Sequence, residues 1–288
     1  MTIGLNRLSP TAYPGAPPLR GAVNDARDVF DIARLQGFEC KSPLLDEAAT
    51  ASAVISGIED AARELRQSPG GIFLIQYAGH GCQVPDRNSD EPDGLDETWC
   101  LYDRMLLDDE LGRLWTRFPR GTRILMISDS CHSGSVARGA DDAFVAAVQR
   151  AGAGRGDDDK EKILKEVVFR YLPSEVAMAA YQQQRTVLNG VSDTVGSREM
   201  DDQGIEASVL LLSGCQDNQL SADLHRNGLF TSRLKEVWND GKFNRIQRPN
   251  YRSFHSAIVS RMPMTQCPNF YPIGEPNIAF WMQKPFTI

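Results

Sequence analysis

Three runs of mainly apolar residues have the length of buried strands. They are IFLIQYA at 72–78, RILMIS at 123–128 and VLLL at 209–212. An almost continuous apolar run of this length is typical of a parallel strand that is covered on both faces. Each run ends in small and polar residues. Because parallel strands bring their carboxyl ends to one edge of a sheet, we expect these polar residues to lie together there.

Stretches with helical periodicity alternate with these strands. The ranges expected to be helical are 24–37, which Asn24 or Asp25 could cap, then 46–68, 108–115, 228–239 and 250–261. Shorter strands are expected at 1–6, from Phe38 and near Ile278–Trp281. This alternation predicts an α/β fold, with a mainly parallel sheet and helices on both faces.

The chain between about residue 135 and residue 206 has a different character. It contains the polar stretches GAGRGDDDKEK and NGVSDTVGSRE around one stretch expected to be helical, EKILKEVVFRYL. We interpret it as an insertion into a single domain that spans residues 1–288. A surface excursion without a role in function is the alternative.

Composition limits the classes of function. The 288 residues carry a formal net charge of −7, and 41% of them are hydrophobic. An acidic chain lacks the positive field that nucleic-acid binding needs, and its hydrophobic content is too high for disorder. No apolar run approaches the roughly 18 residues of a membrane span, and the first ten residues lack a signal-peptide pattern. We therefore expect a cytoplasmic protein with no nucleic-acid or membrane partner.

Six cysteines are widely spaced and form no CxxC pair, so neither a disulfide framework nor a zinc ribbon is indicated. Cys131 stands apart because it follows an apolar strand, while His80 ends another strand between two glycines. A nucleophilic thiol needs an imidazole nearby to take its proton. His132 adjoins Cys131, but neighbouring side chains on an extended backbone point to opposite faces, so His132 is expected to point away.

Five motifs together resemble one protein family. They are LRGAVNDARD (19–28), YAGHG (77–81), DEPDGLDETW (90–99), DSCHSG (129–134) and LLSGCQDNQLSAD (211–223). Their order and spacing resemble the caspase-like cysteine proteases, above all the metacaspase and bacterial orthocaspase branch. The resemblance implies a three-layer sandwich around a mainly parallel six-stranded sheet. It also implies a p20-like part at 1–134, a linker at about 135–206 and a p10-like part at 207–288.

The resemblance implies hydrolysis of peptide bonds through a thioester. Cys131 is then the nucleophile, and His80 assists its deprotonation and protonates the leaving amine. The backbone N–H groups of Gly81 and Cys131 form the oxyanion hole. The chemistry needs no cofactor.

The resemblance further implies cleavage after Arg or Lys, with Asp25, Asp129 and Ala78 in the substrate pocket. The residues themselves agree, because Asp129 and Cys131 are two positions apart and share one face of an extended backbone. Two carboxylates suit a guanidinium, which they can hold through paired hydrogen bonds. Taken alone, Asp25 could equally be a helix cap and Asp129 a turn former.

Calcium is a possible activator. The positions that match the family's acidic cluster are Asp96, Asp108 and Asp109, and hard oxygen ligands suit Ca²⁺. A further acid expected after the CHSG motif is replaced near Arg138. Ordinary solvated acids at a helix N-terminus are the alternative.

Self-processing is a further expectation. The 135–206 segment follows the catalytic loop and contains arginines at which a protease specific for basic residues could cut: Arg138, Arg150, Arg155, Arg170, Arg185 and Arg198. The main rival is a catalytically silent caspase-like scaffold that acts through an unknown partner. A nucleotide-binding protein is disfavoured because no glycine-rich phosphate loop follows the first strand.

Overall fold

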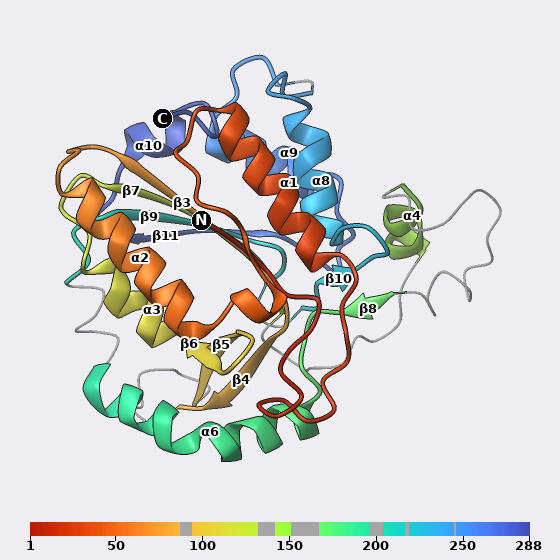
Figure 1. The fold of residues 1–288 in the computed structure, drawn as a ribbon. Helices are drawn as coiled ribbons and strands as arrows, with labels where there is room; N and C mark the ends of the chain where they lie inside the picture. Colours follow the sequence, from red (N-terminus) through yellow and green to blue (C-terminus); the bar gives the residue numbers. More distant parts are fainter. Residues whose placement is uncertain (87–93, 132–141, 151–166, 196–203, 217–218, 245) are drawn as a thin grey trace.

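The computed structural model describes residues 1–288 except 87–93, 132–141, 151–166, 196–203, 217–218 and 245. Its centre is a six-stranded sheet (Figure 1). The strands in spatial order are β11 (Asn269–Gly274), β9 (Ser208–Ser213), β7 (Arg123–Asp129), β3 (Ile72–Ala78), β1 (Thr2–Gly4) and β2 (Leu44–Leu45). All neighbours are parallel except β11 and β9. The mainly parallel six-stranded sheet expected from the sequence is confirmed.

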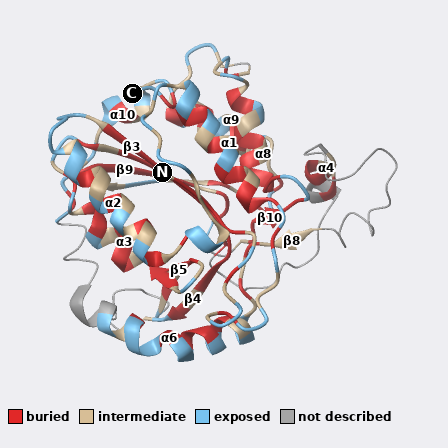
Figure 2. Cartoon of the chain, viewed as in Figure 1, coloured by how far each residue is buried: buried red, intermediate tan, exposed pale blue. Residues whose placement is uncertain are grey.

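Helices cover both faces of the sheet. On one face lie α1 (Ala22–Leu35), α8 (Leu229–Trp238), α9 (Tyr251–Val259) and α10 (Ile278–Met282), and on the other α2 (Ala51–Leu65) and α3 (Asp108–Trp115) (Figure 1). Side chains alternate along β3, so that Leu74 joins the first layer and Phe73 and Ile75 the second. All seven residues of β3 are buried (Figure 2), as expected for a strand between two layers.

Smaller elements complete the fold at the carboxyl end of the central strands. A three-stranded sheet is formed by β4 (Gly81–Pro85), β5 (Leu95–Cys100) and β6 (Met105–Leu107), and the long helix α6 (Ser174–Val195) packs against it. β8 (Val168–Phe169) pairs with β10 (Ala222–Asp223), and α4 (Asp142–Arg150) lies beyond them (Figure 1).

Two expectations near the N-terminus are wrong. No strand begins at Phe38; β2 is the two-residue strand Leu44–Leu45. Asp46 does not start the second long helix but a short 3-10 turn, and α2 follows with Thr50 as its N-cap. The reason is that the Asp46 carboxylate accepts hydrogen bonds from the backbone N–H groups of Asn6 and Arg7, and so fixes the loop after β1.

The expected closing strand near Ile278–Trp281 is also wrong, because these residues form α10. The Asn277 side chain accepts a hydrogen bond from the Phe280 N–H, which starts a helix there. The last strand is β11, antiparallel to β9 at the edge of the sheet. It contains Pro272, which an edge strand tolerates because one of its sides needs no donors.

The helix expected at 161–172 is wrong where the structure describes it. Val168 and Phe169 are the strand β8, Arg170 is a bend and Tyr171 forms an isolated bridge with Gly81, so none of them is helical. The remainder of that range up to residue 166 lies outside the described residues. α4 and α6 are helices that the polar composition of this segment concealed.

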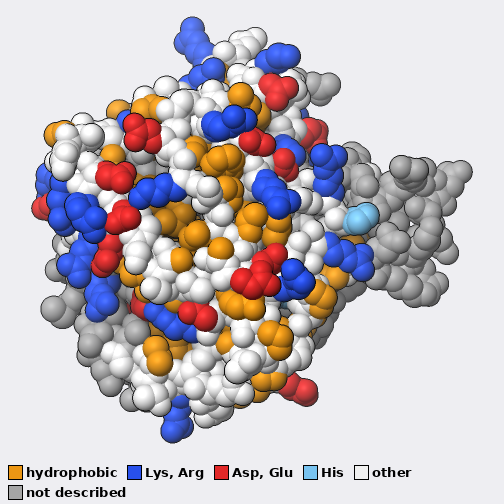
Figure 3. All heavy atoms as spheres, in the orientation of Figure 1, with side chains coloured by type: hydrophobic (Ala, Val, Ile, Leu, Met, Phe, Trp, Pro, Cys, Tyr) orange, Lys and Arg blue, Asp and Glu red, His pale blue; other side chains and the backbone are white. Residues whose placement is uncertain are grey.

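None of the helices within the described part of the chain has the length and apolarity of a membrane span. On the face seen in Figure 3, basic and acidic side chains are intermixed. That face therefore carries no large area of a single charge.

Candidate active site

Neighbouring strands bring the two predicted catalytic residues to one edge of the sheet. In the parallel pair of β3 and β7, Ala78 lies opposite Asp129. His80 and Cys131 each follow two residues after this pair, beyond the ends of β3 and β7. Both side chains are buried, with 1% of His80 and none of Cys131 exposed. His132, Ser133 and Gly134 lie outside the described residues.

The two predicted oxyanion donors converge on one oxygen atom, and that atom belongs to the chain itself. The backbone N–H groups of Gly81 and Cys131 donate to the carbonyl oxygen of Arg170, over N–O distances of 3.0 and 3.2 Å. Two convergent N–H donors of this kind are what a developing oxyanion requires. A peptide carbonyl group therefore already lies between the two predicted donors.

The backbone around Arg170 is bound on both sides. Its N–H donates to the carbonyl of Ser221 over 2.9 Å, and β8, just before it, pairs antiparallel with β10. After it, the N–H of Leu172 donates to the carbonyl of Gly81, also over 2.9 Å. We call residues 168–172 the substrate-like segment, because an extended peptide is bound in the same manner, through its main chain (Figure 1).

The guanidinium of Arg170 lies among three carboxylates. Nη2 is 2.5 Å from Asp25 Oδ2, and Nη1 is 3.1 Å from Asp129 Oδ2. Nε and Nη2 donate to Asp223 Oδ1 over 3.1 and 2.7 Å. All four side chains are completely or almost completely buried. Asp25 and Asp129, predicted together as a pocket for a basic side chain, thus hold one, and Asp223 is a third acid that the sequence reasoning missed.

Further hydrogen bonds fix the three carboxylates. The donors come from the residue before β10, the loop before α8, the first turn of α8 and the loop before α1. They are Asn227 and Gly228 for Asp25, Ser221 and Thr231 for Asp129, and Arg20 and Gly21 for Asp223. The N-cap of α1 is Gly21, so Asp25 is not the helix cap that its sequence context allowed. The pocket is therefore rigid around its occupant.

Gly228 leaves room for the guanidinium. A Cβ atom at this position would lie 2.5 Å from Asp129 Oδ2 and 2.8 Å from Arg170 Cζ. These distances are shorter than van der Waals contact, so only glycine fits here without displacing the pocket or its occupant.

The charges in the pocket depend on one another. Burial raises the pKa of Asp25 to about 7, with Arg170 lowering it and Asp129 raising it further. Burial alone would lower the pKa of Arg170, but Asp129, Asp25 and Asp223 outweigh it and raise that pKa well above its usual value. The pocket is therefore built for a cation that stays protonated.

His80 is held as a neutral imidazole. Burial lowers its pKa to about 4, although the Pro17 carbonyl raises it in part. Nε2 lies 2.7 Å from that carbonyl oxygen and so carries the proton. Nδ1 is left as the unprotonated nitrogen, which can accept a proton from a thiol. Pro17 is thus a positioning group that no pattern in the sequence indicated.

The Cys131 thiol is enclosed. It packs with Cys215 and Leu220, and Phe169 and Tyr171 of the substrate-like segment pack against this cluster. The N–H of Ser221 donates to its Sγ. Nothing from solvent can reach the sulfur atom while these residues stay in place.

Ala78 lies beside the pocket rather than against the guanidinium. It packs in a small apolar cluster with Leu19 and Ala22, and Val168 of the substrate-like segment contacts that cluster. Its position suits the backbone side of a bound peptide.

The predicted calcium ligands lie together without forming a binding site. Burial raises the pKa of Asp108 well above its usual value, and the carboxylates of Glu97, Asp109 and Asp96 add to the rise. Oxygen donors suit Ca²⁺. Within the described ranges, however, no three His, Cys, Asp or Glu side chains converge as metal ligands would. Calcium activation therefore stays a prediction.

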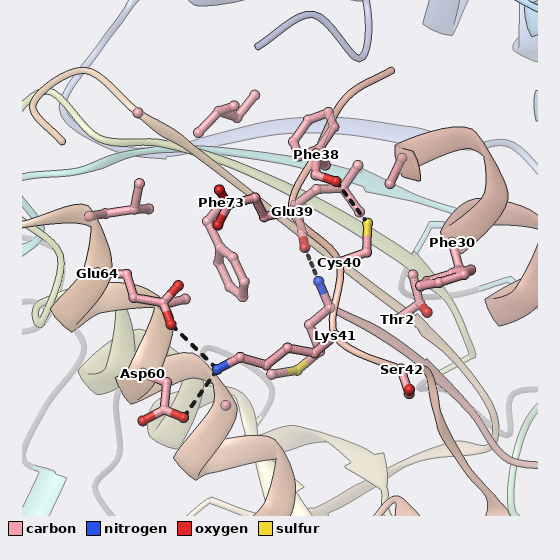
Figure 4. A pocket seen from close by; sticks show the side chains of 18 of the residues that line it. Thr2, Phe30, Phe38, Glu39, Cys40, Lys41, Ser42, Asp60, Glu64 and Phe73 are labelled. Carbon is pink, nitrogen blue, oxygen red and sulfur yellow. Dashed lines mark hydrogen bonds and ion pairs between the residues drawn. The ribbon is translucent and has the colours of Figure 1, made fainter. Parts of the chain in front are cut away.

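A cavity of about 580 Å³ lies elsewhere, beside residues 72–74 at the amino end of β3 (Figure 4). Lys41, Asp60 and Glu64 lie at its rim, with Lys41 paired to both acids. None of the predicted site residues lines it. The substrate pocket itself is not hollow, because the Arg170 side chain fills it.

Comparisons with known proteins agree with this geometry. The family model described as caspase domain matches residues 8–273. The chain is 29% identical to metacaspase-1 of Candida albicans, and the match covers 91% of this chain and 63% of that protein. It is 28% identical to metacaspase-4 of Arabidopsis thaliana, and that match covers 71% of this chain and 49% of that protein. The chain thus spans about half to two thirds of the length of these curated relatives.

Two solved structures have a fold similar to that of this chain. A crystal structure of a protein from Geobacter sulfurreducens is 41% identical, with a TM-score of 0.81 over 100% of this chain and 97% of that one. Caspase-1 from Spodoptera frugiperda is 11% identical, with a TM-score of 0.50 over 94% of this chain and 85% of the other. The second similarity concerns the fold alone.

Proposed function

The chain belongs to the caspase domain family, and on that basis we propose that it is a cysteine endopeptidase that cleaves peptide bonds after arginine, and less well after lysine. Cys131 is the nucleophile and His80 the acid–base group. The metacaspases among its relatives support a protease of this type.

The placement of Arg170 is the observation that carries this proposal. Its carbonyl oxygen lies between the N–H groups of Gly81 and Cys131, while its guanidinium lies among buried carboxylates. A substrate residue on the acyl side of the cleaved bond must satisfy both conditions at once. Arg170 meets both conditions, which supports arginine as the preferred residue.

Asp223 supports a preference for arginine over lysine. Its Oδ1 accepts from both Nε and Nη2 of Arg170. A lysine ammonium is a point charge and has no second donor in the position of Nε. We therefore expect lysine to be held by fewer hydrogen bonds and to be the poorer substrate.

The proposed reaction has four steps. Neutral His80 takes the thiol proton of Cys131, and the sulfur attacks the carbonyl carbon. The N–H groups of Gly81 and Cys131 stabilise the negative oxygen that forms. His80 then protonates the leaving amine as the C–N bond breaks, and water hydrolyses the thioester.

A panel of fluorogenic peptides tests the proposal. The peptides differ only in the residue before the reporter group, which is Arg, citrulline, Lys or Asp. They are incubated with the purified chain and with Arg170→Gln, with and without Ca²⁺. We expect kcat/KM to be about tenfold higher for Arg than for Lys, with no turnover of citrulline or Asp.

Two cysteine variants complete the test. Cys131→Ala should abolish turnover, whereas Cys40→Ala, a change of the same kind beside the distant cavity, should leave it unchanged. Turnover of the Asp peptide alone would contradict the assigned pocket. No turnover by any form would favour the catalytically silent scaffold.

A further inference from the structure

The substrate-like segment occupies every part of the active site at once. It supplies a carbonyl group to the oxyanion hole, a cation to the pocket and main-chain hydrogen bonds to Ser221 and Gly81 on either side. A foreign peptide needs the same donors and acceptors. The two therefore cannot bind together, and the chain excludes other substrates while the segment is in place.

The direction of the segment is that of a substrate. The residue in the pocket, Arg170, is also the residue whose carbonyl lies in the hole, so the bond presented to the nucleophile is the one between Arg170 and Tyr171. An inhibitory side chain without a scissile bond would need only the pocket contacts. Here the carbonyl group of the same residue is also held, by the N–H groups of Gly81 and Cys131.

We propose that the Arg170–Tyr171 peptide bond is a processing site that the chain cuts in itself, and that the chain acts on other peptides only after the substrate-like segment has left. This inference rests on the proposed protease function and names one bond within the 135–206 segment.

The bond changes balance with water as the only co-reactant. Cys131 Sγ forms a bond to the carbonyl carbon of Arg170, and the bond from that carbon to the Tyr171 nitrogen breaks. The thiol proton passes through His80 to the new amino group of Tyr171. A water molecule then hydrolyses the thioester, which leaves a carboxylate on Arg170 and restores the thiol.

Release after the cut has an electrostatic cause. Before it, Arg170 places one positive charge among three carboxylates. Afterwards the same residue also carries a new carboxylate, so its net charge is zero and its attraction to the acidic pocket weakens. The covalent link to α6 is also gone, and the new end follows directly after the two-residue strand β8.

Neither of the other two described arginines of the 135–206 segment, Arg150 and Arg185, has this placement. Arg185 is exposed within α6, where a helical backbone cannot bind as an extended strand. Arg150 ends the helix α4. Arg138, Arg155 and Arg198 lie outside the described residues. Arg185 therefore offers a matched control for Arg170.

Mass spectrometry of the full-length chain tests the processing site. Wild type, Cys131→Ala, Arg170→Gln and Arg185→Gln are purified and incubated under the same conditions. We expect wild type and Arg185→Gln to yield a fragment that begins at Tyr171, at a rate independent of protein concentration because the reaction is intramolecular. Cys131→Ala should stay intact, and Arg170→Gln should give no cut after residue 170.

Alkylation of Cys131 by iodoacetamide tests the closure separately. The variants carry His80→Ala in addition, so that the chain cannot process itself. We expect Cys131 in His80→Ala/Arg170→Gln to react at least about tenfold faster than in His80→Ala/Arg185→Gln. Equal rates in the two would overturn the closure, even if both proteins are equally folded by circular dichroism.

The outcomes separate this inference from the proposed function. If wild type hydrolyses arginine peptides yet remains intact between residues 170 and 171, the function stands and the processing site is wrong. If Arg170→Gln hydrolyses no arginine peptide although its Cys131 is freely alkylated, the proposed function fails instead.

Discussion

At the scale of single residues, the pocket combines three carboxylates with one cation in a place that water does not reach. Such a cluster is costly to bury unless every charge is paired and hydrogen-bonded. The pKa of Asp25 is still raised to about 7, which shows that pairing with Arg170 does not fully offset the cost of burying this carboxylate. Binding of a basic side chain should therefore depend on pH near neutrality.

The Michaelis constant for an arginine peptide should fall as the pH rises above about 7. The pKa of Asp25 is about 7 with the Arg170 guanidinium in the pocket, and that cation lowers it, so binding of a guanidinium favours loss of the Asp25 proton. The pKa of His80, about 4, lies below this window, so the imidazole stays neutral throughout. Asp25→Asn should raise KM at pH 8 and remove its pH dependence. A slope as steep as that of wild type would show that another group titrates.

Asp223→Asn should narrow the preference for arginine. The amide keeps an acceptor oxygen for Arg20 and Gly21 but loses the charge that pairs with Nε and Nη2. A hydrogen bond between charged groups is worth about 1.5–3 kcal/mol, so kcat/KM for the Arg peptide should fall roughly ten- to hundredfold. The value for the Lys peptide should fall less. An unchanged Arg-to-Lys ratio would contradict the role given to Asp223.

At the scale of elements, the ends of strands and helices assemble the site. β3 and β7 present His80 and Cys131 from a rigid sheet, and the start of α8 donates N–H groups to the pocket acids. The positive end of a helix favours carboxylates in this position. Gly228 precedes α8 and can have no side chain, since a Cβ would meet the guanidinium.

Another cluster of acids lies around the first turn of α3, where Asp108 is crowded by neighbouring carboxylates. Because its pKa in the folded state is raised, folding favours its neutral form, and its contribution to stability decreases as the pH rises above about 4. Asp108→Asn should therefore raise the melting temperature by a few degrees at pH 8 and by less at pH 5. The exposed Glu59→Gln serves as the control and should show no such pH-dependent difference.

The effect of Ca²⁺ on the melting temperature is a second test of this acidic cluster. If Ca²⁺ binds there, it should raise the melting temperature of wild type at pH 8 but not that of Asp108→Asn. A shift of equal size in both would place the ion elsewhere.

The sequence predicted the elements that long apolar runs define and missed those that tertiary contacts define. β3, β7 and β9 have continuous apolar sequence, and their positions were predicted to within a residue or two. The prediction missed β8 because Val168 and Phe169 lie in a stretch with helical periodicity, whereas in the fold they pair with β10 as a strand. The same limit hid Asp223, since its place beside Arg170 depends on a contact across 53 residues.

At the scale of the whole molecule, the proposed cut falls between parts that remain interlocked. Residues 171–288 contribute β9 and β11, and β9 pairs with β7 of the earlier part over six residues. α6 is tied to that part by Gln184, which accepts from the Met105 N–H and donates to the Ala12 carbonyl. The central sheet thus continues through both fragments.

The two fragments of the processed chain should therefore stay together. Size-exclusion chromatography should give one peak at the elution volume of uncut Cys131→Ala, and denaturing gels of that peak should show two bands. Dissociation into two native peaks would contradict a sheet shared between the fragments. The uncut variant controls for self-association.

The burial of Arg170 also bears on how the pocket acquires its shape. Three carboxylates cannot leave water together without a counter-ion, and during folding the chain supplies its own. The site is thus assembled around a residue of the kind that it will later bind. Its acids, its hydrogen bonds and the space left by Gly228 are in place before any other peptide arrives, so an incoming arginine meets a template already formed and spends little of its binding energy on ordering it.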